Sequence, residues 1–165
     1  MALGNSNTAN KKCVCGNSLS LTACCLPLIA GKRIASSPEQ LMRSRYSAYV
    51  LHEFKYIHRT YSRTHSAIPS VEDIADSAND TQWLKLNVLD TQIMSPQGQV
   101  EFRVIYKVQG VAYQLHERSD FFFEENQWGY SGGEILADSG EITQPLNGPC
   151  LCGSGKKLKR CCLRT

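Results

Sequence analysis

Residues 13–25 read CVCGNSLSLTACC, and residues 150–162 read CLCGSGKKLKRCC. Each segment consists of Cys-x-Cys-Gly, a loop and a Cys-Cys pair, with eight residues between the inner cysteines. Equivalent cysteines are 137 positions apart (13 and 150, for example), and all eight cysteines of the chain belong to the two copies. Segments this short cannot bury a hydrophobic core of their own. Something other than packing must therefore hold the N-terminal knuckle (residues 13–25) and the C-terminal knuckle (residues 150–162).

Four thiolates that converge on one Zn²⁺ would fold such a segment, because structural zinc takes four Cys or His ligands in a tetrahedron. Zinc binding by small finger peptides is worth on the order of 10–16 kcal/mol, which is enough to order a loop of this size. We therefore predict two zinc ions per chain. The predicted ligands are Cys13, Cys15, Cys24 and Cys25 in the N-terminal knuckle and Cys150, Cys152, Cys161 and Cys162 in the C-terminal knuckle.

Disulfides and thiol redox chemistry are the two alternatives to metal. Disulfides belong to oxidising compartments, and residues 1–12 are polar, without the apolar segment of a secretory signal. A bridge between adjacent cysteines would also be strained. Lys159 and Arg160 could lower the thiolate pKa of Cys161 and favour redox chemistry. An exchange reaction, however, needs two cysteines rather than four in each of two copies, so metal binding is the prediction that explains the whole pattern.

The length and charge of the chain suggest one main domain with a basic cap. Its 165 residues are roughly one domain's worth, and its net charge of +3 is unevenly placed. From Pro149 onward there are five basic residues and no acidic one, whereas the remainder has 13 basic and 15 acidic residues. No apolar run approaches the ~20 residues of a membrane span. We expect a cytoplasmic protein, because a reducing compartment suits so many thiols.

The predicted organisation has three parts. Residues 1–30 contain a leader rich in Asn and Ser, which we expect to be disordered, and the N-terminal knuckle. Residues 31–144 form one α+β domain. Residues 145–165 contain a proline-marked hinge and the C-terminal knuckle.

Two helices are predicted at the start of the central domain. Ser37 is a helix N-cap, followed by proline at the first helical position. Apolar side chains then recur at three- and four-residue steps to about Tyr61, which predicts one continuous helix. Arg43 and Arg45 lie off that apolar stripe. A shorter helix is predicted from Ser70, where Ser-x-x-Asp is a capping-box variant, and it ends before Trp83.

Four strands follow the helices. From Trp83 the apolar residues alternate with polar ones, and turns at 95–98 and 109–110 separate the first three strands. The third strand spans about 111–124, and a fourth runs from about Gln127 to Gly133. Two helices followed by an antiparallel meander predict an α+β fold with the helices packed on one face of a curved sheet.

The cysteine pattern and the helix sequence together carry a family resemblance. Each knuckle resembles the SEC-C motif, a small zinc-binding element found at the C-terminus of the SecA translocase motor and in many unrelated proteins. A copy at each end, with Leu41-Met42-Arg43-Ser44-Arg45-Tyr46 after the first, is similar to the YchJ-like family of small bacterial proteins. That resemblance covers essentially the whole chain and implies a cone-shaped nuclear transport factor 2-like domain. Cone folds of this type often dimerise through the open sheet face, so the resemblance also leaves a homodimer as one alternative for the oligomeric state.

The third strand carries polar residues at alternate positions that are expected to face the core. Glu117 and Ser119 share the parity of Leu115 and Phe121, and a buried acid needs a partner. One interpretation is a small pocket that binds or transforms a ligand. The predicted pocket residues are Trp83, Tyr106, Glu117, Ser119 and Trp128. The other interpretation is structural: an ion pair of Glu117 with Arg43 or Arg45, or a bulge that turns Glu117 outward. His116, on the opposite parity, is expected to face solvent. No catalytic residues are predicted, because no second group can be placed within reach of Glu117.

The loop of the C-terminal knuckle is basic. Lys156, Lys157, Lys159 and Arg160 lie between its cysteine pairs, whereas residues 17–23 of the N-terminal knuckle carry no charge. Charge balance for a dianionic zinc–thiolate centre is one interpretation. The leading hypothesis is a rigid cationic surface that docks an acidic protein. The SecA resemblance implies a chaperone-type, translocation-related or ribosomal partner. Nucleic acid is the competing partner, but aromatic residues for base stacking are missing from the loop.

Overall fold

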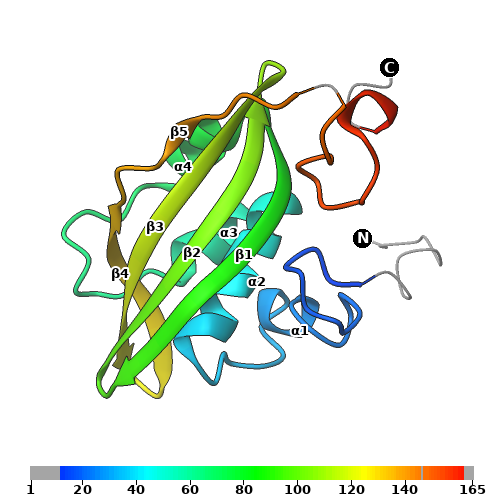
Figure 1. Cartoon of the computed structure of the whole chain (residues 1–165). Helices are drawn as coiled ribbons and strands as arrows, with labels where there is room; N and C mark the ends of the chain where they lie inside the picture. Colours follow the sequence, from blue (N-terminus) through cyan, green and yellow to red (C-terminus); the bar gives the residue numbers. More distant parts are fainter. Residues whose placement is uncertain (1–11, 146, 162–165) are drawn as a thin grey trace.

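The computed structural model describes residues 12–145 and 147–161. The predicted leader, apart from Lys12, and the predicted ligand Cys162 lie outside these residues. Helices α1 (Leu26–Ile29), α2 (Pro38–Val50), α3 (Phe54–Arg59) and α4 (Val71–Ala78) precede the sheet, and a short 3₁₀ turn (Leu158–Arg160) lies in the C-terminal knuckle (Figure 1).

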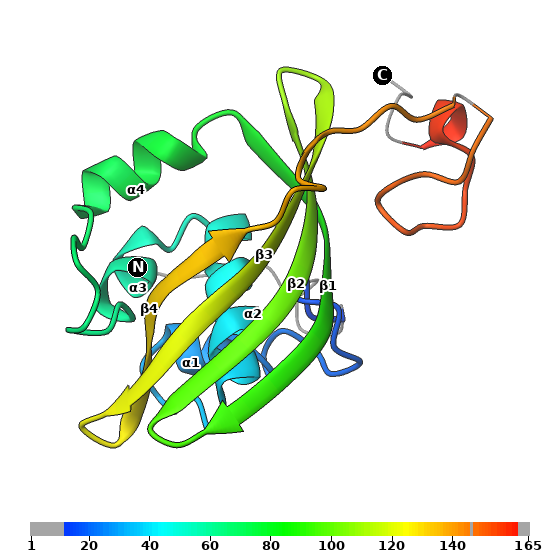
Figure 2. The same cartoon turned by 60° about the vertical axis from the view of Figure 1, so that its left-hand side comes forward.

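The sheet is an antiparallel meander, as the sequence predicted. Strands β1 (Thr81–Met94), β2 (Gln97–Val108), β3 (Val111–Glu124) and β4 (Gln127–Ile135) pair in chain order. The two-residue strand β5 (Gly140–Glu141) was not predicted; it pairs with β3 beyond the end of β4. Figure 2 shows the long strands curving around α2, with the other helices on the same side. The predicted α+β class, with helices on one face of a curved sheet, is confirmed.

The predicted helix from Ser37 to Tyr61 is wrong in one respect, because it is two helices. Ser37 does cap α2, accepting a hydrogen bond from the Gln40 N–H. The break comes at His52, which adopts a left-handed conformation with φ of 58°. The Glu53 N–H bonds to Ala48 O and the His52 N–H to Tyr49 O, the paired bonds of a Schellman helix end. Glycine or asparagine usually occupies that position. Histidine there gave no signal in the sequence.

The core lies between α2 and the concave face of the sheet. Its fully buried side chains include Leu41 from α2, Val100 from β2 and Phe121 from β3. Gly98 on β2 lies against Pro38, where any side chain would collide with the start of α2. This contact fixes the N-terminal end of α2 against the sheet.

His116 does not face solvent, contrary to the prediction. It is on the convex face of β3, opposite in parity to Glu117, yet it is only 6% exposed. Its ring nitrogens lie 2.6 Å from Asp138 Oδ1 and 2.9 Å from Glu101 Oε1. The segment between β4 and β5 brings Asp138 over this face, and because β5 was not foreseen from the sequence, neither was the burial of His116.

Candidate metal centres and an internal cavity

The four N-terminal cysteines converge on one point. The sulfurs of Cys13, Cys15, Cys24 and Cys25 all lie within 4.8 Å of one another. Cys15 Sγ is 3.8 Å from Cys24 Sγ, which in turn is 3.7 Å from Cys25 Sγ. A zinc ion bound by four thiolates at about 2.3 Å has sulfur–sulfur edges of about 3.8 Å, so this donor set fits a tetrahedral zinc.

The C-terminal knuckle repeats this arrangement as far as the structure describes it. The sulfurs of Cys150, Cys152 and Cys161 also lie within 4.8 Å of one another. Cys152 Sγ is 3.5 Å from Cys161 Sγ. The fourth predicted ligand, Cys162, lies outside the described residues. Both clusters can hold a metal ion.

The backbones of the two knuckles match bond for bond. The Cys13 N–H donates to Leu19 O at 2.8 Å, and the Cys150 N–H donates to Lys156 O at 2.7 Å, the same pair shifted by 137 positions. In the same way Gly16 bonds to Cys13 O and Gly153 to Cys150 O, both at 3.0 Å. Gly16 and Gly153 have φ of 86° and 78°, a left-handed conformation that glycine adopts without strain. The sequence repeat is therefore a structural repeat.

Their surroundings differ. Cys15 is 0% exposed and Cys25 is 1% exposed, and both belong to the main hydrophobic core. Cys13 Sγ lies 3.8 Å from the hydroxyl of Ser47 on α2. Cys152 and Cys161 are only half-buried, and the described C-terminal residues are outside that core. Figures 1 and 2 show the N-terminal knuckle against α1 and the C-terminal knuckle projecting beyond β1.

Arginine side chains from the body reach the N-terminal knuckle. Arg43 Nη1 donates to Cys15 O at 2.8 Å, and Arg33 Nη2 donates to Cys24 O at 3.2 Å. Without metal the cysteine thiols of this knuckle differ in how readily they lose a proton. Hydrogen bonds from Cys15 and Cys25 lower the pKa of Cys13, while burial and the nearby thiolates raise the pKa of Cys24 to about 12. A divalent cation would remove this competition by stabilising all the thiolates together.

The basic loop of the C-terminal knuckle is exposed. Lys156, Lys157, Lys159 and Arg160 are all solvent-accessible, whereas Leu158 between them is buried. None of the four takes part in an ion pair with another residue in the described part of the chain.

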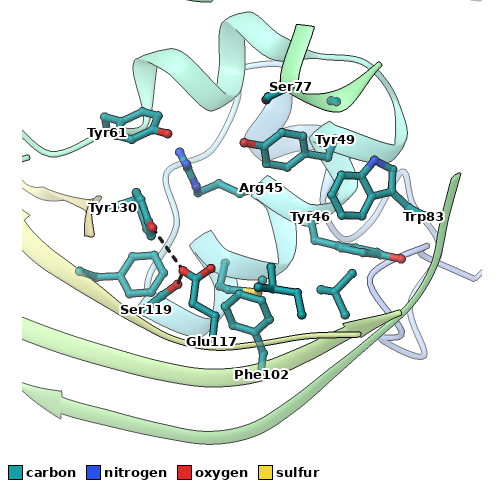
Figure 3. A pocket seen from close by; sticks show the side chains of 15 residues that line it. Arg45, Tyr46, Tyr49, Tyr61, Ser77, Trp83, Phe102, Glu117, Ser119 and Tyr130 are labelled. Carbon is teal, nitrogen blue, oxygen red and sulfur yellow. Dashed lines mark hydrogen bonds between the residues drawn. The ribbon is translucent and has the colours of Figure 1, made fainter. Parts of the chain in front are cut away.

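A cavity of about 220 Å³ lies between the concave face of the sheet and the helices (Figure 3). Its wall comes from α2, α4 and strands β1 to β4. The lining residues are Met42, Arg45, Tyr46, Tyr49, Tyr61, Ser77, Ala78, Trp83, Phe102, Val104, Leu115, Glu117, Ser119, Phe121 and Tyr130.

Three of the predicted pocket residues line this cavity and two do not. The structure places Trp83, Glu117 and Ser119 on its wall. Tyr106 lies outside it, stacked on Tyr113 with ring centroids 5.5 Å apart. Trp128 is also outside, because it packs against Phe123 beside the Gly98–Pro38 contact. Including these two residues in the pocket was incorrect.

Glu117 is held by hydroxyl groups. Ser119 Oγ donates to Glu117 Oε1 at 2.5 Å and the Tyr130 hydroxyl donates to the same oxygen at 3.2 Å. Burial and the charge of Glu117 raise the pKa of Tyr130, which keeps this phenol protonated as a donor. The predicted ion pair of Glu117 with Arg43 or Arg45 is absent among the described residues; Arg43 pairs with Glu39 instead.

Arg45 lines the cavity, whereas the sequence analysis placed it off the apolar helix stripe and named it only as a possible ion-pair partner of Glu117. It is 7% exposed, with Nη1 donating to Ile57 O at 2.8 Å and to Thr60 Oγ1 at 2.6 Å. Its guanidinium carbon lies 4.7 Å from the ring centroids of both Tyr61 and Tyr130. A usable signal existed: Arg45 is three residues after Met42 and four before Tyr49, so it shares their helix face.

The comparisons with known proteins agree with this architecture. Residues 37–133 match the family described as YchJ, middle NTF2-like domain, and residues 147–164 match the SEC-C motif. The chain thus combines an NTF2-like α+β domain with a C-terminal SEC-C motif and an N-terminal cysteine cluster that can also hold a metal ion. A UPF0225 protein of Vibrio cholerae is 38% identical over 152 residues, covering 91% of this chain and 98% of its own. The corresponding protein of Geobacter sulfurreducens is 37% identical over 155 residues, covering 91% and 96%. The chain belongs to the YchJ-like UPF0225 family.

Solved structures support the same conclusion. A SEC-C motif containing protein from Rhodopseudomonas palustris, solved in solution, is 36% identical with a TM-score of 0.71, covering 75% of this chain and 98% of that one. The crystal structure of a SEC-C motif containing protein from Psychrobacter arcticus is 27% identical with a TM-score of 0.65, covering 94% and 97%. Within the described residues, no helix is long and apolar enough to cross a membrane.

Proposed function

We propose that this protein binds one Zn²⁺ in each knuckle and uses the C-terminal knuckle to dock an acidic protein surface in the cytoplasm. Two facts favour zinc: all-thiolate donor sets select soft metals, and the sulfur spacings match a tetrahedral ion of zinc's size. In the N-terminal knuckle the ion completes the folded body. In the C-terminal knuckle it holds a loop in a fixed shape outside the core.

One observation carries the docking proposal. Four basic side chains of the C-terminal knuckle are exposed and without ion-pair partners in the described residues, while Leu158 anchors the turn between them. Fixing the loop in advance lowers the entropy that a partner must overcome on binding. Exposed like charges on one rigid loop attract an oppositely charged surface and raise its association rate.

Charge balance for the metal centre is the competing explanation. In the N-terminal knuckle, arginine side chains bond to the carbonyls of the ligand cysteines, as Arg43 does to Cys15 O. Among the described residues, the side chains of Lys156, Lys157, Lys159 and Arg160 donate no such bond to a carbonyl of a ligand cysteine, and all four are exposed. An outward-facing charge contributes little to holding the metal and is available to a partner. An acidic chaperone-type or ribosomal protein surface suits it better than RNA, because the loop offers no aromatic ring for stacking.

The test is capture by metal-loaded protein, comparing two matched double variants. Lys156→Glu/Lys157→Glu reverses two charges in the basic loop, and Lys32→Glu/Lys55→Glu reverses two exposed charges on the body. At low salt the wild type and the body variant should retain the same acidic proteins or ribosomes, and the loop variant should lose them at least tenfold. Zinc content, measured on the same samples, should be equal in all three.

Two results would contradict the proposal. One is equal capture of the same partners by the loop variant and the wild type. The other is loss of zinc from the loop variant, since that assigns the basic residues to metal retention. Preferential, salt-sensitive binding of single-stranded RNA by the same loop would replace the protein partner with nucleic acid.

A further inference from the structure

The cavity contains a buried positive charge whose balance is incomplete. Arg45 is 7% exposed, and none of the ion pairs among the described residues involves it. Its Nη1 donates to a carbonyl and a hydroxyl, and its flat faces meet two tyrosine rings. These contacts orient a guanidinium but do not neutralise it, and burying an unpaired charge is costly. Among the described residues only Nη1 of this guanidinium donates hydrogen bonds, so further N–H donors remain for a ligand.

A second charged group lies across the same cavity. Both protein donors to Glu117 bond to Oε1, and Oε2 has no hydrogen bond among the described residues. Gly133 on β4 makes room for this carboxylate, since a Cβ there would collide with Oε1. Figure 3 shows Glu117 rising from the sheet and Arg45 extending from α2 into the same cavity, with Tyr130 beside both. The cavity thus presents donors on its helical side and an acceptor on its sheet side.

The remaining wall limits what can fit. Phe102, Val104 and Leu115 make its sheet face apolar, and the indole N–H of Trp83 is buried without a hydrogen-bond partner among the described residues. The volume of about 220 Å³ is smaller than a drug-sized site and admits a molecule of roughly ten non-hydrogen atoms. Such a ligand needs an apolar body, with polar groups only at its ends.

From these three features we propose that the cavity binds a small organic carboxylate that carries a hydrogen-bond donor at its other end. The carboxylate pairs with Arg45 in the fork geometry that guanidinium groups favour. A hydroxyl or amine at the far end donates to Glu117 Oε2, and the apolar body lies on Phe102 and Leu115. Glu117 also rejects dicarboxylates, because a second negative charge would lie beside it. This site is separate from both metal clusters and from the basic loop.

Three matched compounds test the ligand class on the unmodified, metal-loaded chain. 4-Hydroxyphenylacetate has both groups, phenylacetate lacks the donor, and 4-hydroxyphenylacetamide lacks the charge. We expect saturable NMR shifts at cavity residues such as Tyr49 and Leu115 with 4-hydroxyphenylacetate. Binding should be several-fold weaker for phenylacetate and at least tenfold weaker for the amide. No saturable shift with either acid, or an amide that binds as well as the acids, overturns the proposal.

Two variants of cavity residues and one matched control test where the ligand binds. Glu117→Gln keeps an acceptor for Ser119 and Tyr130 but puts an amide N–H where Oε2 accepts, so the preference for 4-hydroxyphenylacetate over phenylacetate should fall to near one. Arg118→Gln is the matched control: it removes a charge from the opposite face of the same strand, where Arg118 pairs with Glu101. It should leave all three affinities within twofold. An unchanged preference in Glu117→Gln, or an equal change in Arg118→Gln, contradicts the placement. Arg45→Lys, which keeps the charge but loses the fork, should weaken both acids at least fivefold.

Discussion

The two knuckles have the same local structure and different relations to the rest of the molecule. Their backbone hydrogen bonds coincide after a shift of 137 positions, and both turn at a left-handed glycine. Yet the sulfur of Cys15 is inside the main core, whereas its counterpart Cys152 is half-exposed and outside it. A metal-held loop carries its own folding energy. It can therefore either complete a hydrophobic core or stand apart from one, and the residues around it decide which.

The two knuckles also differ in which residues supply the positive charge near their cysteines. The N-terminal loop has no charged residue, and the body supplies Arg33 and Arg43 to its carbonyls. The C-terminal loop carries its own four cations. The neutral N-terminal loop therefore has two cations nearby, both supplied by neighbouring segments. The case for docking thus depends on the outward exposure of the C-terminal cations, not on their mere presence.

The largest expected effect is that of breaking the buried metal site. Cys15→Ser should release one zinc and destabilise the body by more than about 4 kcal/mol, because it removes both a metal ligand and part of the core. Urea unfolding followed by circular dichroism, with zinc analysis of the same sample, measures both effects. A variant that lost zinc but unfolded like the wild type would show that the N-terminal knuckle is as peripheral as the C-terminal one.

Removing the body's cation from the N-terminal knuckle should have the next largest effect. Arg43→Gln loses a charged hydrogen bond to Cys15 O, worth about 1.5–3 kcal/mol when the group is mostly buried. Lys156→Gln, in the basic loop, is the control and should change stability by less than about 0.5 kcal/mol. Equal effects in thermal unfolding would mean that the two knuckles obtain their charge balance in the same way.

The paired glycines provide a smaller and closely matched test. Alanine at Gly16 or Gly153 costs about 1–2 kcal/mol locally, since L-residues avoid positive φ. Gly16→Ala should lower the unfolding free energy of the body by about that amount. Gly153→Ala should spare the body and instead weaken zinc retention at the C-terminal site, measured by competition with a chelator. Identical global destabilisation by both variants would contradict the view that only the N-terminal knuckle is part of the folded body.

The smallest expected effect on the body comes from Cys152→Ser, the counterpart of the first variant. It should release one zinc, leave the body's unfolding free energy within about 0.5 kcal/mol of wild type, and increase hydrogen exchange only near residues 147–161. Loss of cooperative unfolding here would place the C-terminal knuckle in the folding unit of the body.

Much of the fold could be predicted from the sequence because its signals are local. Each of these signals depends only on residues close together in the sequence. They are the cysteine repeat, the helix caps at Ser37 and Ser70, and the alternation of apolar and polar residues from Trp83 onward. The break at His52 gave no such signal. Strand β5 has two residues and no alternating pattern to detect. His116 is covered by Asp138 from the segment between β4 and β5, so its environment could not be inferred.

The cavity was half-predictable for a similar reason. Glu117 and Ser119 could be placed on the inner face by strand parity, but the sequence could not say which residues lie opposite them. Arg45 was named only as a possible ion-pair partner of Glu117 and was placed off the apolar stripe, although its helix position places it beside Met42 and Tyr49 on the cavity wall. Tyr106 and Trp128 are aromatic residues that would suit a cavity wall, but they lie towards the ends of the curved sheet. The sequence pattern does not show how far along a strand the cavity extends. Cavities depend on tertiary packing, which periodicity does not encode.

Stepwise removal of zinc from the full chain tests the difference between the knuckles most directly. A chelator is titrated into the protein while released zinc is counted and the body is followed by NMR. We predict that the first equivalent leaves the signals of the sheet and α2 unchanged and alters only residues near 147–161. The second equivalent should be released together with unfolding of the body. Loss of the folded spectrum with the first equivalent, or a folded body after both are gone, would contradict this account.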